Sequence, residues 1–335
     1  MPLKVIHSPH HNRHVKMGRI RPAKPASEHL RFRNYLVKGV ALPTPPATED
    51  WSPAGQPALS NIYENDTLGD CVIAGGYHVE AVWTGNAGQL FTATDQQITA
   101  DYSAIGGYVP GDPSTDNGCD EQTALNYWTS TGFASGDKLV GWLAVDATDQ
   151  TLLKQALYLF ENLYFGVELP DAWVSNMPQS SGFTWDVAGA PDPSNGHCIV
   201  GVGYAAQGVT IDTWGLLGTL TWAAAAKYMI PAAGGDAYIL VSKAQLGKAQ
   251  AKAPNGFDWA TLIADFDAIG GNVPAPVPPT PTPAPPASTG IITIDTVNKI
   301  VTLPPGITAV RQNGPQVEYY PHRNEVGIPV GWQSQ

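Results

Sequence analysis

Cys71, His197 and Asp212 are residues whose types could together perform nucleophilic chemistry. Cys71 follows the turn-type residues Gly69 and Asp70 and precedes mostly apolar positions, which predicts that a helix begins at the cysteine. A thiol in the first turn of a helix has its thiolate stabilised by unsatisfied backbone N–H groups and by the helix dipole. The alternative for a lone cysteine is a small apolar side chain that fills space at the helix start.

A thiol nucleophile needs a base, and His197 is the candidate for that role. His78 lies about two helical turns from Cys71 on the same predicted helix, so its ring is not expected to reach the sulfur. His197 follows an Asn-Gly turn and begins a predicted strand. Asp212 ends the next strand, where its carboxylate could hold the far nitrogen of the imidazole. These residues therefore predict a nucleophile, a base and an orienting group.

The elements that must position these residues fall into a helical part and a stranded part. Helices are predicted over residues 71–85, 94–102, 120–130 and 150–161, and strands over residues 164–169, 198–204, 209–214 and 237–241. Helices that come first, followed by strands, predict an α+β body.

The N-terminal arm, residues 1–48, is basic, whereas the rest of the chain is acidic. The arm holds half of the 18 Lys and Arg residues, in a chain whose formal net charge is −11. It has no hydrophobic period, so we expect it to be extended until it meets a partner, which could be nucleic acid, an acidic protein surface or the chain's own acidic body. A solvated tail without a partner is an alternative. A third interpretation is a regulatory leader that lies over the active site.

The C-terminal part is expected to be separate from the main domain, residues 49–271. The prolines of residues 272–290 predict a polyproline spacer. Residues 291–335 then form a small β tail that begins with a predicted hairpin. We expect this tail to attach the protein to a larger assembly.

Cysteine usage and hydropathy bear on where the protein works. Three cysteines without a CxxC pair cannot form a disulfide framework, and they disfavour redox or structural zinc chemistry. No apolar run approaches a membrane span, and the N-terminus is not of the signal-peptide type. We therefore expect a soluble protein of the cytoplasm, or of a particle assembled there, that uses no cofactor and no metal.

In their order and spacing these residues resemble the papain-like cysteine peptidase family, over most of residues 50–245. The family's cysteine lies at a helix start with a glycine two positions before it, as do Cys71 and Gly69. Its histidine leads into a strand that ends Val-Gly-Tyr, as His197 does. Its Asn-Ser-Trp-Gly motif looks like the Asp-Thr-Trp-Gly that begins at Asp212.

The resemblance implies a fold of two subdomains, a helical half and an antiparallel β-barrel-like half. It also implies that Asn65, one methylene shorter, stands where the family has its oxyanion-hole glutamine, and that Trp214 shields the histidine. Cys71 would attack an acyl carbon, and Asn65 with a backbone N–H would stabilise the oxyanion. His197 would protonate the leaving group. The substrate would be a peptide or another acyl compound.

The sequence departs from the family's pattern at several positions. Asp212 replaces the family's asparagine and would favour the imidazolium that pairs with a thiolate. Cys119 matches a family disulfide cysteine, but its partner position holds Leu68, which is consistent with a reducing compartment. Glu121 and Gln122 replace the paired glycines that bind substrate backbone in the family, a change that bears on how a peptide would bind.

A hypothesis from a different class is a structural or attachment protein of a large assembly, such as a phage virion, that reuses this scaffold without catalysis. The basic arm, the proline spacer and the tail are what a component of an assembly needs, whereas a soluble protease needs none of them. The two hypotheses are compatible if the assembly carries the enzyme.

Overall fold

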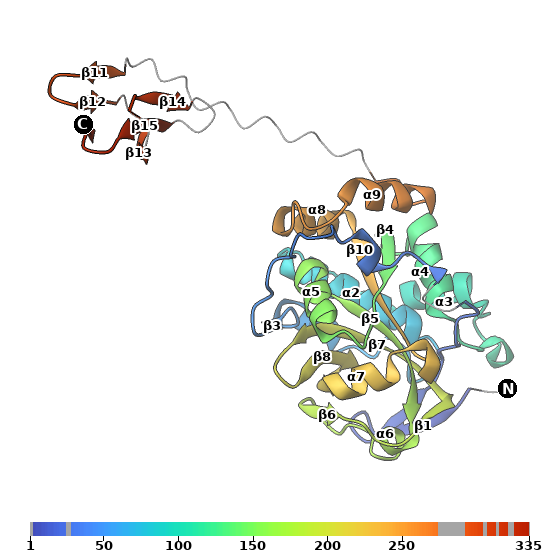
Figure 1. Cartoon of the computed structure of the whole chain (residues 1–335). Coiled ribbons are helices and arrows are strands. Elements are labelled where there is room, and N and C mark those ends of the chain that lie inside the picture. The colour runs from blue at the N-terminus through green and yellow to red at the C-terminus, as the bar shows by residue number, and fades with distance from the viewer. Residues whose placement is uncertain are drawn as a thin grey trace. The chain divides into compact units, whose positions relative to one another are not determined.

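The chain divides into two units in a computed structural model, Met1–Val273 and Pro274–Gln335 (Figure 1). The structure describes residues 3–24, 28–273, 292–303, 307–312, 315–320 and 325–334. Most of the proline-rich spacer expected over residues 272–290 lies outside these described residues.

An eight-stranded sheet forms the centre of the first unit (Figure 1). Its strands pair antiparallel, except that β6 runs parallel to β9. Their order across the sheet is β4 (Leu139–Ala144), β10 (Asp236–Ser242), β5 (Leu163–Pro170), β7 (Pro191–Tyr204), β8 (Gly208–Thr213), β9 (Leu216–Thr221) and β6 (Phe183–Trp185), and β3 (Glu49–Asp50) also pairs with β7.

Both faces of this sheet are buried, and β7 makes the arrangement clear. Successive side chains of a strand point to opposite faces. Cys198 and Val200 accordingly belong to one hydrophobic cluster, and Ile199 between them belongs to another. The first cluster is completed by α2 (Cys71–Asn86), α3 (Asp95–Gly106) and α4 (Glu121–Ser130), and the second by α5 (Gln150–Phe160), α7 (Trp222–Tyr228), α8 (Lys243–Lys252) and α9 (Trp259–Ala268).

The α+β class expected from the sequence is confirmed, and local capping explains where several helices begin. Thr94 and Gln97 form a capping box at α3, and the side chains of Asp120 and Asp149 cap α4 and α5. Short helices complete the unit at α1 (Gln56–Leu59) and α6 (Asp171–Ser175). Among the described residues, no helix combines the length and the apolar character needed to cross a membrane.

The N-terminal residues belong to the first unit and are partly buried in it. Strands β1 (Val5–Ser8) and β2 (Arg13–Lys16) pair as an antiparallel hairpin. Val15 and Met17 have almost no exposed surface and join the cluster on the α5 side of the sheet. The arm expected to be extended is therefore folded over this length, because the body supplies the apolar surface that its own sequence lacks.

The described residues of the second unit form two small sheets. The hairpin predicted at its start is confirmed, since β11 (Thr293–Asp295) pairs antiparallel with β12 (Ile300–Thr302). Val301, Val326 and Ile328 form its buried core. The other strands are β13 (Thr308–Gln312), β14 (Glu318–Tyr320), β15 (Glu325–Pro329) and β16 (Gln333–Ser334).

Candidate active site

The residues expected to form an active site line one small cavity of about 20 Å³. Cys71 comes from the start of α2, His197 from β7, Asp212 from β8, and Asn65 and Trp214 from the loops beside them. The structure therefore brings together segments that lie far apart in the sequence. A volume of this size holds about one water molecule and no peptide.

Cys71 is the first residue of α2, and its side chain is removed from solvent. Only 2% of the residue is exposed. Burial raises the pKa of the thiol to about 12, while backbone hydrogen bonds with Cys198 and Gly18 act in the opposite direction. Asp70, the N-cap residue, makes no side-chain capping bond, and the charge of its buried carboxyl disfavours the thiolate further. The sulfur is thus a neutral thiol in this state, despite its place at a helix N-terminus.

His197 is held by a hydroxyl and an indole. Its Nε2 lies 2.8 Å from Oγ1 of Thr213, and its ring stacks on Trp214 with centroids 4.1 Å apart. Its Nδ1 is buried and has no hydrogen-bond partner among the described residues. Burial lowers the pKa of the imidazole to about 3. Nδ1 is therefore the nitrogen left to exchange a proton with a thiol or a substrate.

Asp212 does not make the contact with His197 that the sequence led us to expect. Its Oδ2 lies 2.8 Å from Nδ1 of His78 on α2, and Nε2 of His78 lies 3.0 Å from the Asn61 carbonyl. Asp212 and Thr213 are neighbours on β8 and so project to opposite sides of the strand. Only one of the two can face His197, and that residue is Thr213.

Asn65, the expected oxyanion donor, is engaged by the N-terminal arm. Its side-chain amide donates to the Leu68 carbonyl at 3.1 Å and to the Lys16 carbonyl at 3.3 Å. The Lys16 N–H in turn donates to the Asn65 carbonyl at 2.9 Å. A carbonyl of the arm thus takes a hydrogen bond from the group expected to stabilise a substrate's oxyanion.

The arm crosses the site as an extended stretch that we call the cleft segment, residues 16–20. The Arg19 N–H donates to the Gly196 carbonyl at 3.1 Å, immediately before the candidate base. On the other side, the Cys119 N–H donates to the Gly18 carbonyl at 3.0 Å, and the Cys119 carbonyl accepts from the last residue of the segment at 3.0 Å. The segment is therefore paired through its backbone with both walls of the site.

Glycines let the cleft segment lie this close to the walls. A Cβ on Gly18 would stand 1.9 Å from the carbonyl oxygen of Gly69, the glycine two positions before the candidate nucleophile. A Cβ on Gly118 would stand 2.0 Å from the Gly18 oxygen, and one on Gly196 2.2 Å from the Arg19 oxygen. A Cβ on Gly69 itself would stand 2.1 Å from Cδ1 of Leu3 and 3.2 Å from Cα of Gly18, so a glycine at this position also leaves room for the arm.

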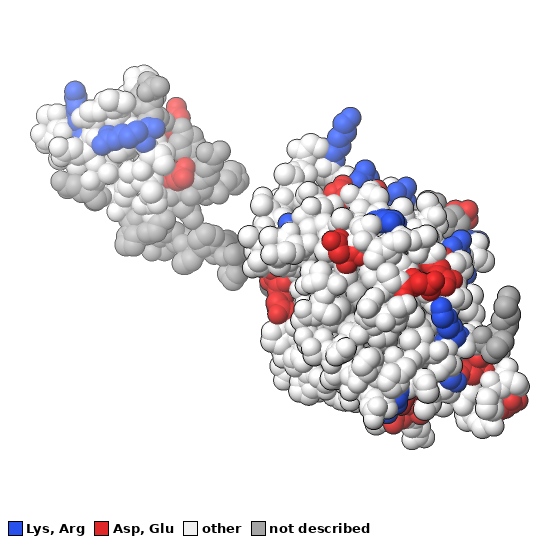
Figure 2. Space-filling view, turned by 90° about the horizontal axis from the view of Figure 1, so that it is seen from below, with Lys and Arg blue, Asp and Glu red and all other residues white. Residues whose placement is uncertain are grey.

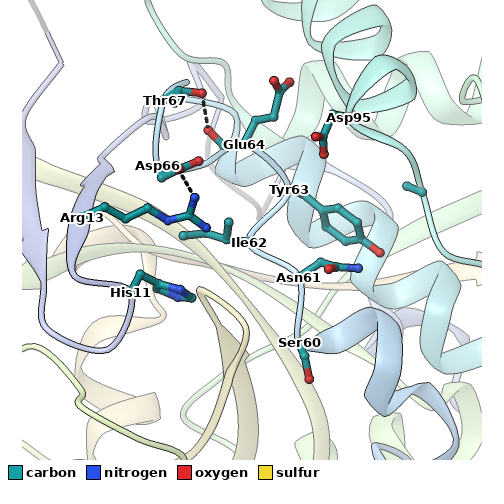
Figure 3. Close-up of a pocket in the computed structure, with 11 residues that line it drawn as sticks. His11, Arg13, Ser60, Asn61, Ile62, Tyr63, Glu64, Asp66, Thr67 and Asp95 are labelled. Atoms are coloured by element: carbon teal, nitrogen blue, oxygen red, sulfur yellow. Dashed lines mark hydrogen bonds and ion pairs between the residues drawn. The ribbon is translucent and has the colours of Figure 1, made fainter.

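The β1–β2 hairpin of the arm lies beside the loop that precedes Cys71. A polar pocket of about 460 Å³ lies between the tip of the β1–β2 hairpin and residues 60–67 (Figure 3). Arg13 reaches across it to Asp66 at 2.6 Å. His11 Nε2 lies 2.7 Å from the Trp214 carbonyl.

The basic residues of the arm meet acidic residues of the body. Besides the Arg13–Asp66 pair, ion pairs of 2.6 to 2.8 Å join Lys16 to Asp116, Arg19 to Glu121 and Asp236, Arg21 to Glu168, and Arg33 to Asp149. On the face seen in Figure 2 acidic and basic side chains are interspersed. These basic residues of the arm therefore have acidic partners within the chain.

Comparison with known proteins bears on the fold. No family model matches the sequence, and no curated protein matches it. Xylellain, a cysteine protease from Xylella fastidiosa, superposes with a TM-score of 0.51 at 16% identity, over 71% of this chain and 98% of that chain. Procathepsin L2 from Tenebrio molitor larval midgut gives a TM-score of 0.46 at 15% identity, over 67% of this chain and 78% of its own. The superposition with xylellain supports the papain-like fold of this chain.

Proposed function

We propose that the chain is a papain-like cysteine peptidase that its own cleft segment holds closed. The supporting observation is that the site at Cys71 binds an extended polypeptide by backbone hydrogen bonds on both sides, through Asn65, Gly196 and Cys119. A site that holds one extended segment in this way can hold another. A peptide is therefore the better candidate substrate than another acyl compound, even though Glu121 and Gln122 replace the paired glycines that bind substrate backbone in the family.

The proposed chemistry begins with transfer of the Cys71 proton to His197. The thiolate attacks the peptide carbonyl carbon, forming a C–S bond, and the oxyanion accepts hydrogen bonds from Asn65 and from the Cys71 N–H. His197 then gives its proton to the leaving amine as the C–N bond breaks. Water attacks the thioester with His197 as the base, which releases the acid and restores the thiol.

The closed state is expected to be unreactive. Burial raises the pKa of Cys71 and lowers that of His197, so both groups are neutral near pH 7. If the cleft segment left, water would enter the site. The burial that disfavours the thiolate of Cys71 and the imidazolium of His197 would then be removed. The helix dipole at Cys71 could then favour the thiolate, as its place in the fold suggests.

The variant Gly18→Ala tests this proposal, because its methyl group cannot fit beside Gly69. Iodoacetamide at pH 7 should label Cys71 at least tenfold faster in this variant than in the native chain, as read by intact mass. Gly247→Ala is the matched control, since a Cβ there meets no atom within 4 Å. Labelling should fall in Gly18→Ala/His197→Ala and disappear in Gly18→Ala/Cys71→Ala. An inert Cys71 in the opened chain would favour a non-catalytic attachment protein.

A further inference from the structure

Arg19 is the most completely buried cation of the described residues, and its pocket is separate from the reacting groups. Its side chain has no exposed surface. Nε donates to Glu121 at 2.6 Å, Nη2 to Asp236 at 2.7 Å and Nη1 to the Gly234 carbonyl at 2.6 Å. Each of the three guanidinium nitrogens thus has an acceptor from the body.

The pocket walls are shaped around a guanidinium. A Cβ on Gly166 would stand 2.2 Å from Glu121 Oε1 and 2.5 Å from two nitrogens of Arg19, so only glycine leaves room there. Glu121 has no exposed surface, and its second oxygen, Oε2, is buried without a hydrogen-bond partner among the described residues. One acceptor in the pocket therefore remains open even with Arg19 in place.

Without the Arg19 cation, the body would hold two buried carboxyls that no positive charge compensates. Burial raises the pKa of Glu121 to about 7 and that of Asp236 to about 6, and the Arg19 charge acts against both shifts. Two carboxyls in a water-poor pocket are unfavourable as ions unless a cation pairs with them. A departing cleft segment therefore leaves a site that favours a replacement cation of the same shape.

The pocket also lies at the right place for a substrate side chain. The Arg19 amide donates to the carbonyl of Gly196, the neighbour of His197. The adjacent Gly18 lies close enough to Cys71 for its backbone to act against the raised pKa of the thiol. The guanidinium thus enters from a residue one position away from the residue that meets the nucleophile.

We propose that Glu121, Asp236 and the Gly234 carbonyl form a specificity pocket for an arginine side chain next to the bond to be cleaved. Arg19 occupies this pocket in the closed chain, and an arginine-containing peptide replaces it in the open one. The inference rests on the proposed function, which supplies the cleaved bond, but binding to the pocket requires no catalysis.

Binding is tested in full-length Arg19→Ala/Cys71→Ala, in which the pocket is empty and no reaction follows. The probes are N-acetyl-arginine amide and N-acetyl-citrulline amide, which differ in the charge of the terminal group. Calorimetry should show the arginine probe binding at least tenfold more tightly, because charged hydrogen bonds are about twice as strong as neutral ones. Adding Glu121→Gln should remove most of this preference. Adding Asp192→Asn, which changes a carboxylate near Lys4, should preserve it.

Cleavage is tested with matched peptides that carry arginine or citrulline at one position. Full-length Gly18→Ala/Arg19→Ala, in which the cleft segment is also displaced, should cleave the arginine peptide with a kcat/KM at least tenfold higher than the citrulline peptide, and adding Asp236→Asn should reduce that ratio. Arg19→Lys serves as a second variant, because it keeps a cation that can support folding. Its single ammonium group cannot reach all three acceptors as the planar guanidinium does, so it fills the pocket less completely.

The outcomes separate the two proposals. Tight binding of the arginine probe without any cleavage would overturn the proposed peptidase and leave the pocket standing. Cleavage without preference for arginine, or equal binding of the two probes, would overturn the pocket. Retention of the preference after Glu121→Gln would also overturn it.

Discussion

Nε2 of His197 and Oγ1 of Thr213 lie 2.8 Å apart, and this contact fixes which imidazole nitrogen is left for chemistry. A hydroxyl can donate or accept, so it can hold the ring as either neutral tautomer or as the imidazolium. It carries no charge, however, and cannot stabilise the imidazolium as a carboxylate would. The orienting role expected of Asp212 therefore becomes, in our account, a role of Thr213.

Replacing Thr213 should impair turnover without impairing the fold. Thr213→Val keeps the shape and removes a hydrogen bond worth about 1 kcal/mol, so kcat for peptide hydrolysis should fall about fivefold to tenfold in the Gly18→Ala background. Thr210→Val on the same strand is the control. An unchanged kcat would show that the hydroxyl does not orient the base.

Asp212→Asn should act mainly on stability. The carboxylate faces His78 in a buried site, so its loss should lower the free energy of unfolding by about 1–3 kcal/mol, measured by urea denaturation. The kcat of the folded enzyme should change far less than in Thr213→Val. A large fall in kcat at unchanged stability would instead show that Asp212 orients His197.

The pH dependence of Cys71 alkylation should report whether the cleft segment is in place. With the pKa of the thiol raised to about 12, the rate in the native chain should climb about tenfold per pH unit between pH 7 and 9, since only the thiolate reacts. In Gly18→Ala the rate should level off within that range. A plateau already present in the native chain would contradict the closed state.

The neutral, buried His197 should make the native chain sensitive to acid. Its folded-state pKa is lowered to about 3 from an ordinary value of 6.5, so the unfolded chain binds the proton more readily. The stability from this group is present above pH 6.5 and is lost as the pH falls toward 3. As the pH falls across that range, the Tm of the native chain should therefore decrease more than the Tm of His197→Asn. Parallel pH profiles of the two proteins would rule out this contribution.

The sequence was sufficient for the elements that carry a local signal. The helix at Cys71 and the strand from Cys198 to Tyr204 have continuous apolar patterns, and the capping pair Thr94 and Gln97 marks the next helix. The strand Leu139–Ala144 was not predicted, because a short apolar run without alternation does not separate a strand from a helix.

The pairing of side chains across the site was harder to predict, for a physical reason. Asp212 and Thr213 differ by one position on β8, and strand register decides which of them faces His197. The role of Arg19 depends on contacts with Glu121 and Asp236, more than 100 residues away. The only sequence signal for these contacts was that the arm is basic and the body acidic. That signal did not distinguish the body from nucleic acid or another protein as the partner of the arm.

The most direct test of the account is hydrolysis of a fluorogenic arginine peptide by the full-length chain at pH 7. We expect Gly18→Ala to cleave it at least tenfold faster than the native chain and Gly247→Ala, and Gly18→Ala/Cys71→Ala to be inactive. Equal rates in the native and Gly18→Ala chains, or activity that survives the loss of Cys71, would contradict a thiol peptidase closed by its own N-terminal segment.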